Sequence, residues 1–212
     1  MYFRFKFSIH IKAGIMMKMK IVYIILGVIV VLFIASQIFF MSSQKNIEQY
    51  PFKVVKTYDN FEIRNYEATL FTTVKLPTNK YNKAASKGFS VLAGYIFGGN
   101  NKGEKIAMTS PVAMTLKDTT TMMFMVPKKY TKNNLPTPND TSIKFKKIPA
   151  KKMAAISFGG WADDKKIETY KKQLIIALKK EGIKYSNNFL FLGYNAPFEI
   201  FNRKNEIIVE LK

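Results

Sequence analysis

The first feature of the chain is a block of apolar residues that no charge interrupts. It runs from Ile21 to Met41, and about 20 apolar residues at roughly 1.5 Å per residue suffice to span the roughly 30 Å hydrocarbon core of a bilayer. Residues 1–20 contain five basic residues and no acidic one, and two of the five, Lys18 and Lys20, directly precede the block. The positive-inside rule therefore predicts a single-pass transmembrane anchor with a cytoplasmic N-terminus and the remaining chain on the extracytoplasmic (periplasmic) side.

Two other interpretations of this block remain open. A cleaved signal peptide has a shorter apolar region and small residues at its cleavage site, whereas Phe39, Phe40 and Met41 stand at the end of this one. The third interpretation is a buried core helix. Methionines at positions 16, 17 and 19 also offer later starts of translation, which would remove His10, the only histidine.

After a polar tether at residues 42–50, the first half of the chain alternates between strand-like and helix-like patterns. Apolar positions recur at every second residue from Ala68 to Leu76, which predicts an extended, partly bulged strand that includes the segment around Ile63. Spacings of four, three and four then predict a helix over Tyr81 to Phe97, with Ala85, Phe89, Leu92 and Ile96 as its apolar stripe and Gly98 at its end. Strands are expected at Lys105 to Leu116 and Thr120 to Val126.

The second half repeats this order. Residues Ile143 to Phe158 predict a strand bent at Pro149, and a helix follows that begins at Asp163 and Asp164 and ends near Gly182. The last strands are expected at Phe189 to Tyr194 and Glu206 to Lys212. Two successive β-α-β-β units predict one duplicated α+β domain over residues 51–212, with a barrel-like antiparallel sheet and two flanking helices.

Composition narrows the chemistry that this domain can perform. The formal net charge is +20, which attracts polyanions, anionic headgroups and acidic ligands. No Arg-rich helix, zinc spacing or aromatic RNA-binding motif is present, so nucleic acid is not an expected partner. Because the domain has no histidine and the chain no cysteine, it offers no imidazole base, thiolate or usual zinc cluster. We expect no catalytic residues, no metal site and no enzyme activity.

Several local strings are similar to one known family. They are Phe89-x-x-Leu92-x-x-Tyr95-Ile96-Phe97-Gly98, then Lys105 to Val112 (KIAMTSPV), Phe124-Met125-Val126-Pro127, Phe158-Gly159-Gly160, and Tyr194-x-x-Pro197 followed by Arg203-Lys204-Asn205-Glu206. In order and spacing these strings resemble the signatures of the SOUL haem-binding proteins, from about Pro51 to Lys212. The resemblance implies a duplicated β-α-β-β barrel and a hydrophobic groove alongside the first helix for haem or another tetrapyrrole. It implies no reaction.

The expected binding residues lie on the first helix and near the C-terminus. Lys87, Val91 and Tyr95, spaced four and four, place a cation, an aliphatic side chain and an aromatic ring on one stripe. Such a stripe suits an apolar macrocycle with carboxylates, and Arg203 is a further candidate partner for a propionate. The plainer interpretation of the stripe is a solvated helix face with Tyr95 partly packed. Arg203, Asn205 and Glu206 equally suit a structural network, and Trp161 a packing anchor.

The absence of histidine is a departure from the family. Haem iron is commonly held by His, Met, Cys or Tyr, and here only Tyr95 and a set of methionines, which more often fill cores, are available. Two functions follow from these residues. The first is a membrane-anchored, non-catalytic tetrapyrrole-binding protein. The alternative is an interaction or effector-binding module of the same fold that binds a protein, peptide or lipid headgroup; an open apolar cleft beside Val91 would favour the first.

Overall fold

The computed structural model describes residues 19–39, 47–196 and 199–212. It divides into two compact units, residues 1–45 and residues 46–212. Within the first unit lies one helix, Met19–Phe39, whose 21 residues have a mean hydropathy of 2.8 over their most apolar stretch. By length and composition this helix can cross a membrane, and its apolar side chains are exposed. The predicted boundary at Met41 and residues 42–46 of the tether predicted at 42–50 lie outside the described residues.

The second unit contains nine strands and two helices in a symmetrical order. The elements are β1 (Phe52–Thr57), β2 (Glu62–Tyr66), β3 (Thr69–Leu76), α2 (Tyr81–Ile96), β4 (Val112–Thr115), β5 (Thr120–Met125), β6 (Lys144–Ile148), β7 (Lys151–Gly159), α3 (Asp164–Lys180), β8 (Tyr185–Gly193) and β9 (Lys204–Leu211). All pairings are antiparallel, in the order β1-β2-β7-β9-β8-β4-β5-β3-β6. The predicted duplicated α+β fold is confirmed in this order of elements.

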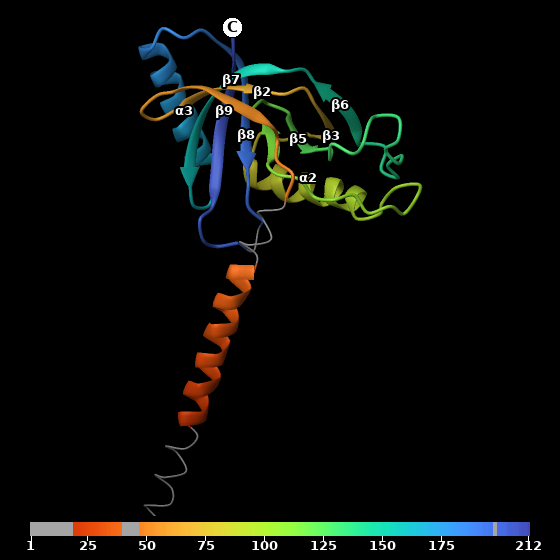
Figure 1. Cartoon of the computed structure of the whole chain (residues 1–212), viewed down its shortest axis with the longest axis vertical. Coiled ribbons are helices and arrows are strands. Elements are labelled where there is room, and N and C mark those ends of the chain that lie inside the picture. Colours follow the sequence, from red (N-terminus) through yellow and green to blue (C-terminus); the bar gives the residue numbers. More distant parts are fainter. Residues whose placement is uncertain (1–18, 40–46, 197–198) are drawn as a thin grey trace, which may run out of the picture. The chain divides into compact units, whose positions relative to one another are not determined.

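The first half of the domain (β2, β3, α2, β4 and β5) and the second half (β6, β7, α3, β8 and β9) exchange their first strands. Strand β2 of the first half pairs with β7 of the second half, and β6 of the second half pairs with β3 of the first half. The halves meet where β4 pairs with β8. Because each half completes the sheet of the other, the repeats form one folding unit and not two. The sheet curls into a half-barrel that stays open, with β1 and β6 as its edges, so the predicted barrel is correct only as a partial barrel (Figure 1).

The strand exchange explains two differences from the predicted strands. The expected bulged strand is two strands, β2 and β3, which are separated by Glu67 and Ala68 and lie at different places in the sheet. The strand expected to bend at Pro149 is likewise β6 followed by β7. Strand β1 was not predicted. Five of its six residues are exposed, and an edge strand of this kind carries no alternating apolar pattern.

The curled sheet buries a core on each of its faces. The helix-side core lies under α2, which packs on β3 and β5, and under α3, which packs on β7, β8 and β9. The inner core lies within the curl and is formed mainly by Tyr50, Tyr66, Phe71, Met123, Met125, Met153, Leu192 and Ile208. Methionines supply both cores: Met114 and Met122 belong to the first, and Met123 and Met125 to the second. Their predicted role as core residues is confirmed.

Candidate ligand-binding groove along α2

One flank of α2 is built from small side chains. Ser86, Ser90 and Gly94 follow one another at intervals of four residues, which places them on one side of the helix. A Cβ atom added at Gly94 would meet no other atom within 4 Å. This flank therefore leaves open space beside the helix, whereas the buried residues Ala84, Gly88 and Leu92 fill the face toward the sheet.

A cavity of about 830 Å³ occupies this space, a volume within the range of small-molecule sites. Phe89 of α2 and Phe97, which directly follows this helix, form part of its wall, and Trp161, in the segment before α3, is 55% exposed and forms another part. The lining also includes buried apolar residues of the strands, namely Met114, Met122 and Phe191. Its polar lining residues are Asn82, Ser86, Ser90, Asn195 and Asn205 with Tyr81. The cavity is therefore mostly apolar with a few polar groups.

Arg203 provides the positive charge of the groove. Its guanidinium carbon lies 3.9 Å from the centre of the Trp161 ring, in a cation–π arrangement. Nη1 donates to the carbonyl oxygen of Ala196 at 2.9 Å and to that of Glu199. The buried Nε has no hydrogen-bond partner among the residues that the structure describes. Burial lowers the pKa of Arg203, but an arginine stays charged at neutral pH.

The charge of the groove selects for anions. Of the residues that line it, all of which the structure describes, Arg203 is charged and none is an aspartate or glutamate. A guanidinium with one edge unpaired can bind a carboxylate through two parallel hydrogen bonds. An apolar cavity with one such cation at its wall suits a flat, apolar molecule that carries a carboxylate.

The four residues predicted to bind a ligand do not share one cavity. Arg203 lines the α2 groove, but Lys87, Val91 and Tyr95 do not. Lys87 is exposed and Val91 is half-buried. Tyr95 is buried at 2% exposure, and its hydroxyl donates to the carbonyl oxygen of Pro136 at 2.9 Å. Burial raises the pKa of Tyr95 to about 12, which disfavours the phenolate that would ligate iron.

The groove flank could have been found from the sequence by its small residues. The prediction followed the stripe of long side chains at 87, 91 and 95, but a helix provides a ligand with space only where its side chains are short. Ser86, Ser90 and Gly94 form the adjacent stripe of that kind. Trp161 carried a second signal, because a tryptophan between Gly160 and a charged helix start has little of its own sequence to pack against.

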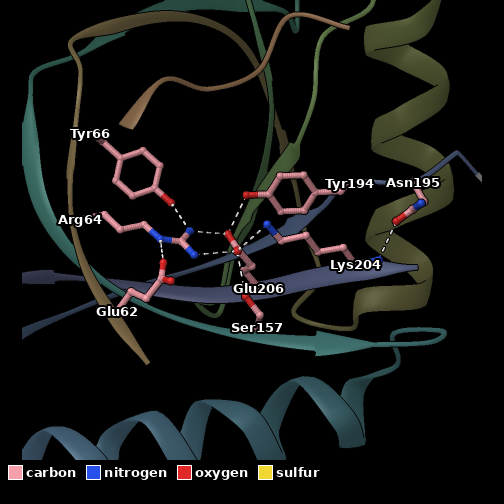
Figure 2. Close-up of polar contacts among 8 residues, drawn as sticks. All are labelled: Glu62, Arg64, Tyr66, Ser157, Tyr194, Asn195, Lys204 and Glu206. Atoms are coloured by element: carbon pink, nitrogen blue, oxygen red, sulfur yellow. Dashed lines mark hydrogen bonds and ion pairs between the residues drawn. The ribbon is translucent and has the colours of Figure 1, made fainter. Parts of the chain in front are cut away.

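A second polar cluster is buried on the inner face of the sheet (Figure 2). Glu206 of β9 has no exposed surface, and its carboxylate accepts hydrogen bonds from Arg64 Nη1 at 2.9 Å and Nη2 at 3.0 Å. Tyr194 donates to Glu206 at 2.6 Å and Ser157 donates at 2.9 Å. Lys204 adds an ion pair at 3.1 Å. Glu206 thus joins residues of β2, β7 and β9 and the end of β8.

The charges of this cluster are paired. Burial by itself raises the pKa of Glu206, but the hydrogen bonds and charge of Arg64, with Tyr194 and Lys204, outweigh it and hold the pKa below its usual value. Burial and the Glu206 charge raise the pKa of Tyr194. We therefore assign the cluster a structural role. Arg203 is not part of this cluster, and Asn205 donates to the carbonyl oxygen of Gly160 at 2.8 Å. The residues of the C-terminal signature therefore have different roles: Glu206 belongs to the polar cluster, Arg203 lines the groove, and Asn205 binds the backbone.

Comparison with known proteins identifies the family. The family model described as SOUL heme-binding protein matches residues 47–210. The chain belongs to the SOUL heme-binding family. The match covers every strand of the second unit except the last residue of β9, and both α2 and α3.

Vertebrate members of the SOUL family are similar at low identity. Heme-binding protein 1 of Xenopus laevis is 26% identical over 155 residues, which cover 69% of this chain and 81% of that protein. Heme-binding protein 1 of Sus scrofa is 25% identical over 174 residues, or 76% of this chain and 92% of that protein. Heme-binding protein 2 of Mus musculus is 26% identical over 157 residues, or 70% of this chain and 76% of that protein.

Two solved structures share the fold at low sequence identity. The C-terminal domain of EcmrR superposes with a TM-score of 0.57 at 10% identity, over 72% of this chain and 96% of that domain. A hydrolase from Listeria innocua superposes with a TM-score of 0.52 at 8% identity, over 74% of this chain and 94% of that hydrolase. At these identities the likeness concerns the fold alone.

Proposed function

We propose that this chain is a non-catalytic binding protein that holds haem or a related tetrapyrrole in the α2 groove. The observation that carries the proposal is the combination in one cavity of apolar walls with the single cation Arg203. A tetrapyrrole has a large apolar ring and anionic propionates, and its recognition requires both features. Membership of a family whose curated relatives are named for haem binding supports the same ligand class.

The residues of the groove fit the macrocycle and one propionate. Phe89, Phe97 and Trp161 offer aromatic surface to the ring, and Arg203 offers its positive charge to a carboxylate. When bound, haem supplies an iron-centred redox and ligand-binding chemistry. The residues here contribute apolar contact, orientation through Arg203 and exclusion of water. No histidine or cysteine occurs in residues 46–212, so we propose binding through the ring and its carboxylates.

A pair of substitutions at Gly94 tests the site. Gly94→Phe places a ring in the open space beside α2, and because the position is exposed and a Cβ meets nothing there, the fold has room for it. We expect haemin and metal-free protoporphyrin, titrated into the full chain in detergent micelles and followed by absorbance, to lose saturable binding in Gly94→Phe. Gly94→Ala, the matched control, should bind as the parent does.

Substitutions at Arg203 and Val91 test which side of α2 binds the ligand. Loss of a charged hydrogen-bonding partner costs about 1.5–3 kcal/mol, so Arg203→Met should weaken binding by at least tenfold, whereas Arg203→Lys should weaken it less. Val91→Glu tests the flank predicted from the sequence. If Val91→Glu abolished binding while Gly94→Phe did not, the ligand would lie on the side of Lys87 and Val91 and the proposed groove would be wrong.

We also propose that the helix Met19–Phe39 anchors the protein in a membrane. Its length and hydropathy suit a span, and the excess of basic residues before it favours a cytoplasmic N-terminus. The binding domain would then lie on the extracytoplasmic side. Such a protein would present or sequester a tetrapyrrole at the membrane surface.

A further inference from the structure

A second cavity lies within the curl of the sheet, on the opposite face from the α2 groove. Its volume is about 340 Å³, at the lower end of the range for small-molecule sites. The two cavities are separated by the sheet itself, since Met122 lines one and its neighbour Met123 lines the other. The inner cavity is therefore independent of the proposed tetrapyrrole site.

The buried part of its wall is apolar. The lining includes Met123 of β5, Met153 of β7 and Ile208 of β9, each of which is buried in the inner core. Ile148 and Leu190, which are partly buried, also line it. Residues of six strands, β4 to β9, thus surround the cavity, and its volume suits a single alkyl chain and not a lipid with two.

Tyr50 lines the same cavity and carries a hydroxyl group. Its ring packs on Tyr66 and Phe71 at centroid distances of 4.6 and 5.2 Å, and the residue is 8% exposed. Its backbone N–H donates to Ser110 at 3.0 Å, which fixes the position of the residue. Within the described part of the chain its hydroxyl makes no hydrogen bond, and burial raises its pKa to about 12. The hydroxyl oxygen is not fully enclosed by protein, so it can donate a hydrogen bond to a ligand in the cavity.

Two lysines flank Tyr50. Lys151 is the cross-strand partner of Tyr66 and Lys146 that of Phe71, the two rings on which Tyr50 packs. Lys117 and Lys147 also line the cavity. Against these four cations stands one carboxylate, that of Glu210, and it is already paired with Lys151. The mouth of the cavity therefore carries a net positive charge.

From these contacts we infer that the inner cavity binds a single-chain fatty acid. The alkyl chain lies against Met123, Met153 and Ile208, and the carboxylate accepts the hydroxyl hydrogen of Tyr50 on the side of Lys146. Cationic and neutral molecules of the same length lack the carboxylate that this arrangement requires. The site is distinct from the α2 groove, so one chain can hold a fatty acid and a tetrapyrrole at the same time.

The test is photo-crosslinking of a diazirine-bearing fatty acid to the full chain in nanodiscs, followed by peptide mapping. We expect labelled peptides from Lys144 to Met153, with the labelling competed by excess laurate and not by dodecylamine, dodecanol or protoporphyrin. Partition into the bilayer alone would label Met19–Phe39 and would respond to none of these competitors. Labelling confined to that helix, or equal competition by laurate and dodecylamine, would overturn the inference.

Three variants locate the carboxylate and the chain. Tyr50→Phe removes one hydrogen bond and should reduce the affinity for laurate about fivefold. Lys146→Glu, at an exposed position that the fold does not need, should reduce it at least tenfold. Leu190→Trp, at a half-buried position, should block entry of the chain. Circular dichroism verifies folding of each variant. Unchanged labelling in folded Lys146→Glu contradicts the proposed site, whether or not the other two variants fold.

Discussion

Gly88 and Gly94 lie on the same helix and face different surroundings. A Cβ added at Gly88 would come within 2.7 Å of Leu76 Cδ1 and within 3.0 Å of the Met122 sulfur, whereas one added at Gly94 would meet nothing. Gly88 therefore permits α2 to approach the sheet closely. Gly94 instead leaves room for the groove. The same residue type thus serves packing at one position and an opening at the other.

Alanine at these two positions separates the two roles. Both substitutions gain the same helix propensity, about 1 kcal/mol, so the difference between them isolates packing. Overpacking of a core costs about 1–3 kcal/mol. We expect the free energy of unfolding, measured in urea, to be lower for Gly88→Ala than for Gly94→Ala by that amount. Equal stabilities would show that the packing of α2 against β3 is looser than described.

Glu206 makes the stability of the domain depend on acid. Its pKa in the folded state lies below the ordinary value of 4.5, so its stabilising contribution is complete above that value and is lost as the pH falls toward the folded-state pKa. Glu206→Gln should cost roughly 3–5 kcal/mol, because it leaves the charge of buried Arg64 without its partner. It should also flatten the loss of stability below about pH 4.5, measured by urea unfolding at several pH values. An unchanged pH dependence in the variant would assign the effect to other carboxylates.

Of the four residues expected to bind a ligand, Arg203 is the one that lines the α2 groove, and its role as a propionate partner stays a prediction. Arg203 also binds the carbonyl oxygens of Ala196 and Glu199, as the alternative structural interpretation expects. Tyr95 lies elsewhere, because the carbonyl of Pro136, 41 residues away in sequence, accepts its hydroxyl hydrogen in the core. A contact across that distance leaves no periodic signal in the helix itself.

At the scale of elements, two adjacent aspartates cap the two helices. Asp163 is the N-cap of α3, and its side chain accepts the Lys166 N–H at 2.7 Å. The next residue, Asp164, accepts the backbone N–H of Tyr81 at 2.7 Å, at the start of α2. No side chain of its own caps α2 at Lys80. The first turn of α3 thus supplies the missing cap of the helix that forms the groove.

Removal of each aspartate should affect the helix that it caps. A lost cap costs about 1 kcal/mol, so Asp164→Ala should lower the free energy of unfolding by about that amount and increase hydrogen exchange at the first turn of α2. Asp163→Ala is the matched control, since it should cost a similar amount while leaving exchange in α2 unchanged. Equal exchange profiles in the two variants would mean that Asp164 does not hold α2.

The hydrophobic pattern predicted where an element lies when that element buries one or both of its sides. The helices α2 and α3 were predicted to within a residue or two of their ends, because each buries one side against the sheet. The breaks after β2 and β6 were underestimated, since residues 67–68 and 149–150 interrupt the chain path without interrupting the period-two pattern. Only the pairing partners, which are distant in sequence, show that each long strand is two.

At the scale of the molecule, the C-terminal strand β9 is an interior strand of the sheet. It lies between β7 and β8, and its residues Ile207, Ile208 and Val209 are fully buried. Deletion of residues 207–212 should therefore leave a chain without cooperative unfolding by circular dichroism. Deletion of Lys212 alone, the matched control, should preserve the transition. A folded chain lacking 207–212 would contradict the single-unit fold.

The absence of cysteine permits a clean test of topology. Single cysteines can be introduced at Ser8 and at exposed Asn133 without removing any other. If the domain lies outside the cytoplasm, a membrane-impermeant maleimide should label Asn133→Cys in intact cells and Ser8→Cys only after lysis. Labelling of both variants in intact cells, or of neither, would contradict the proposed orientation.

Trp161 permits the most direct measurement of the proposed groove. It is the only tryptophan of the chain and lines the cavity with Arg203 against its ring. Titration of haemin or protoporphyrin should therefore quench its fluorescence in a saturable one-to-one manner, and Gly94→Phe should abolish the quenching while Gly94→Ala retains it. Tetrapyrrole binding detected by absorbance with unchanged tryptophan fluorescence would contradict the account, because the ligand would then lie away from the α2 groove.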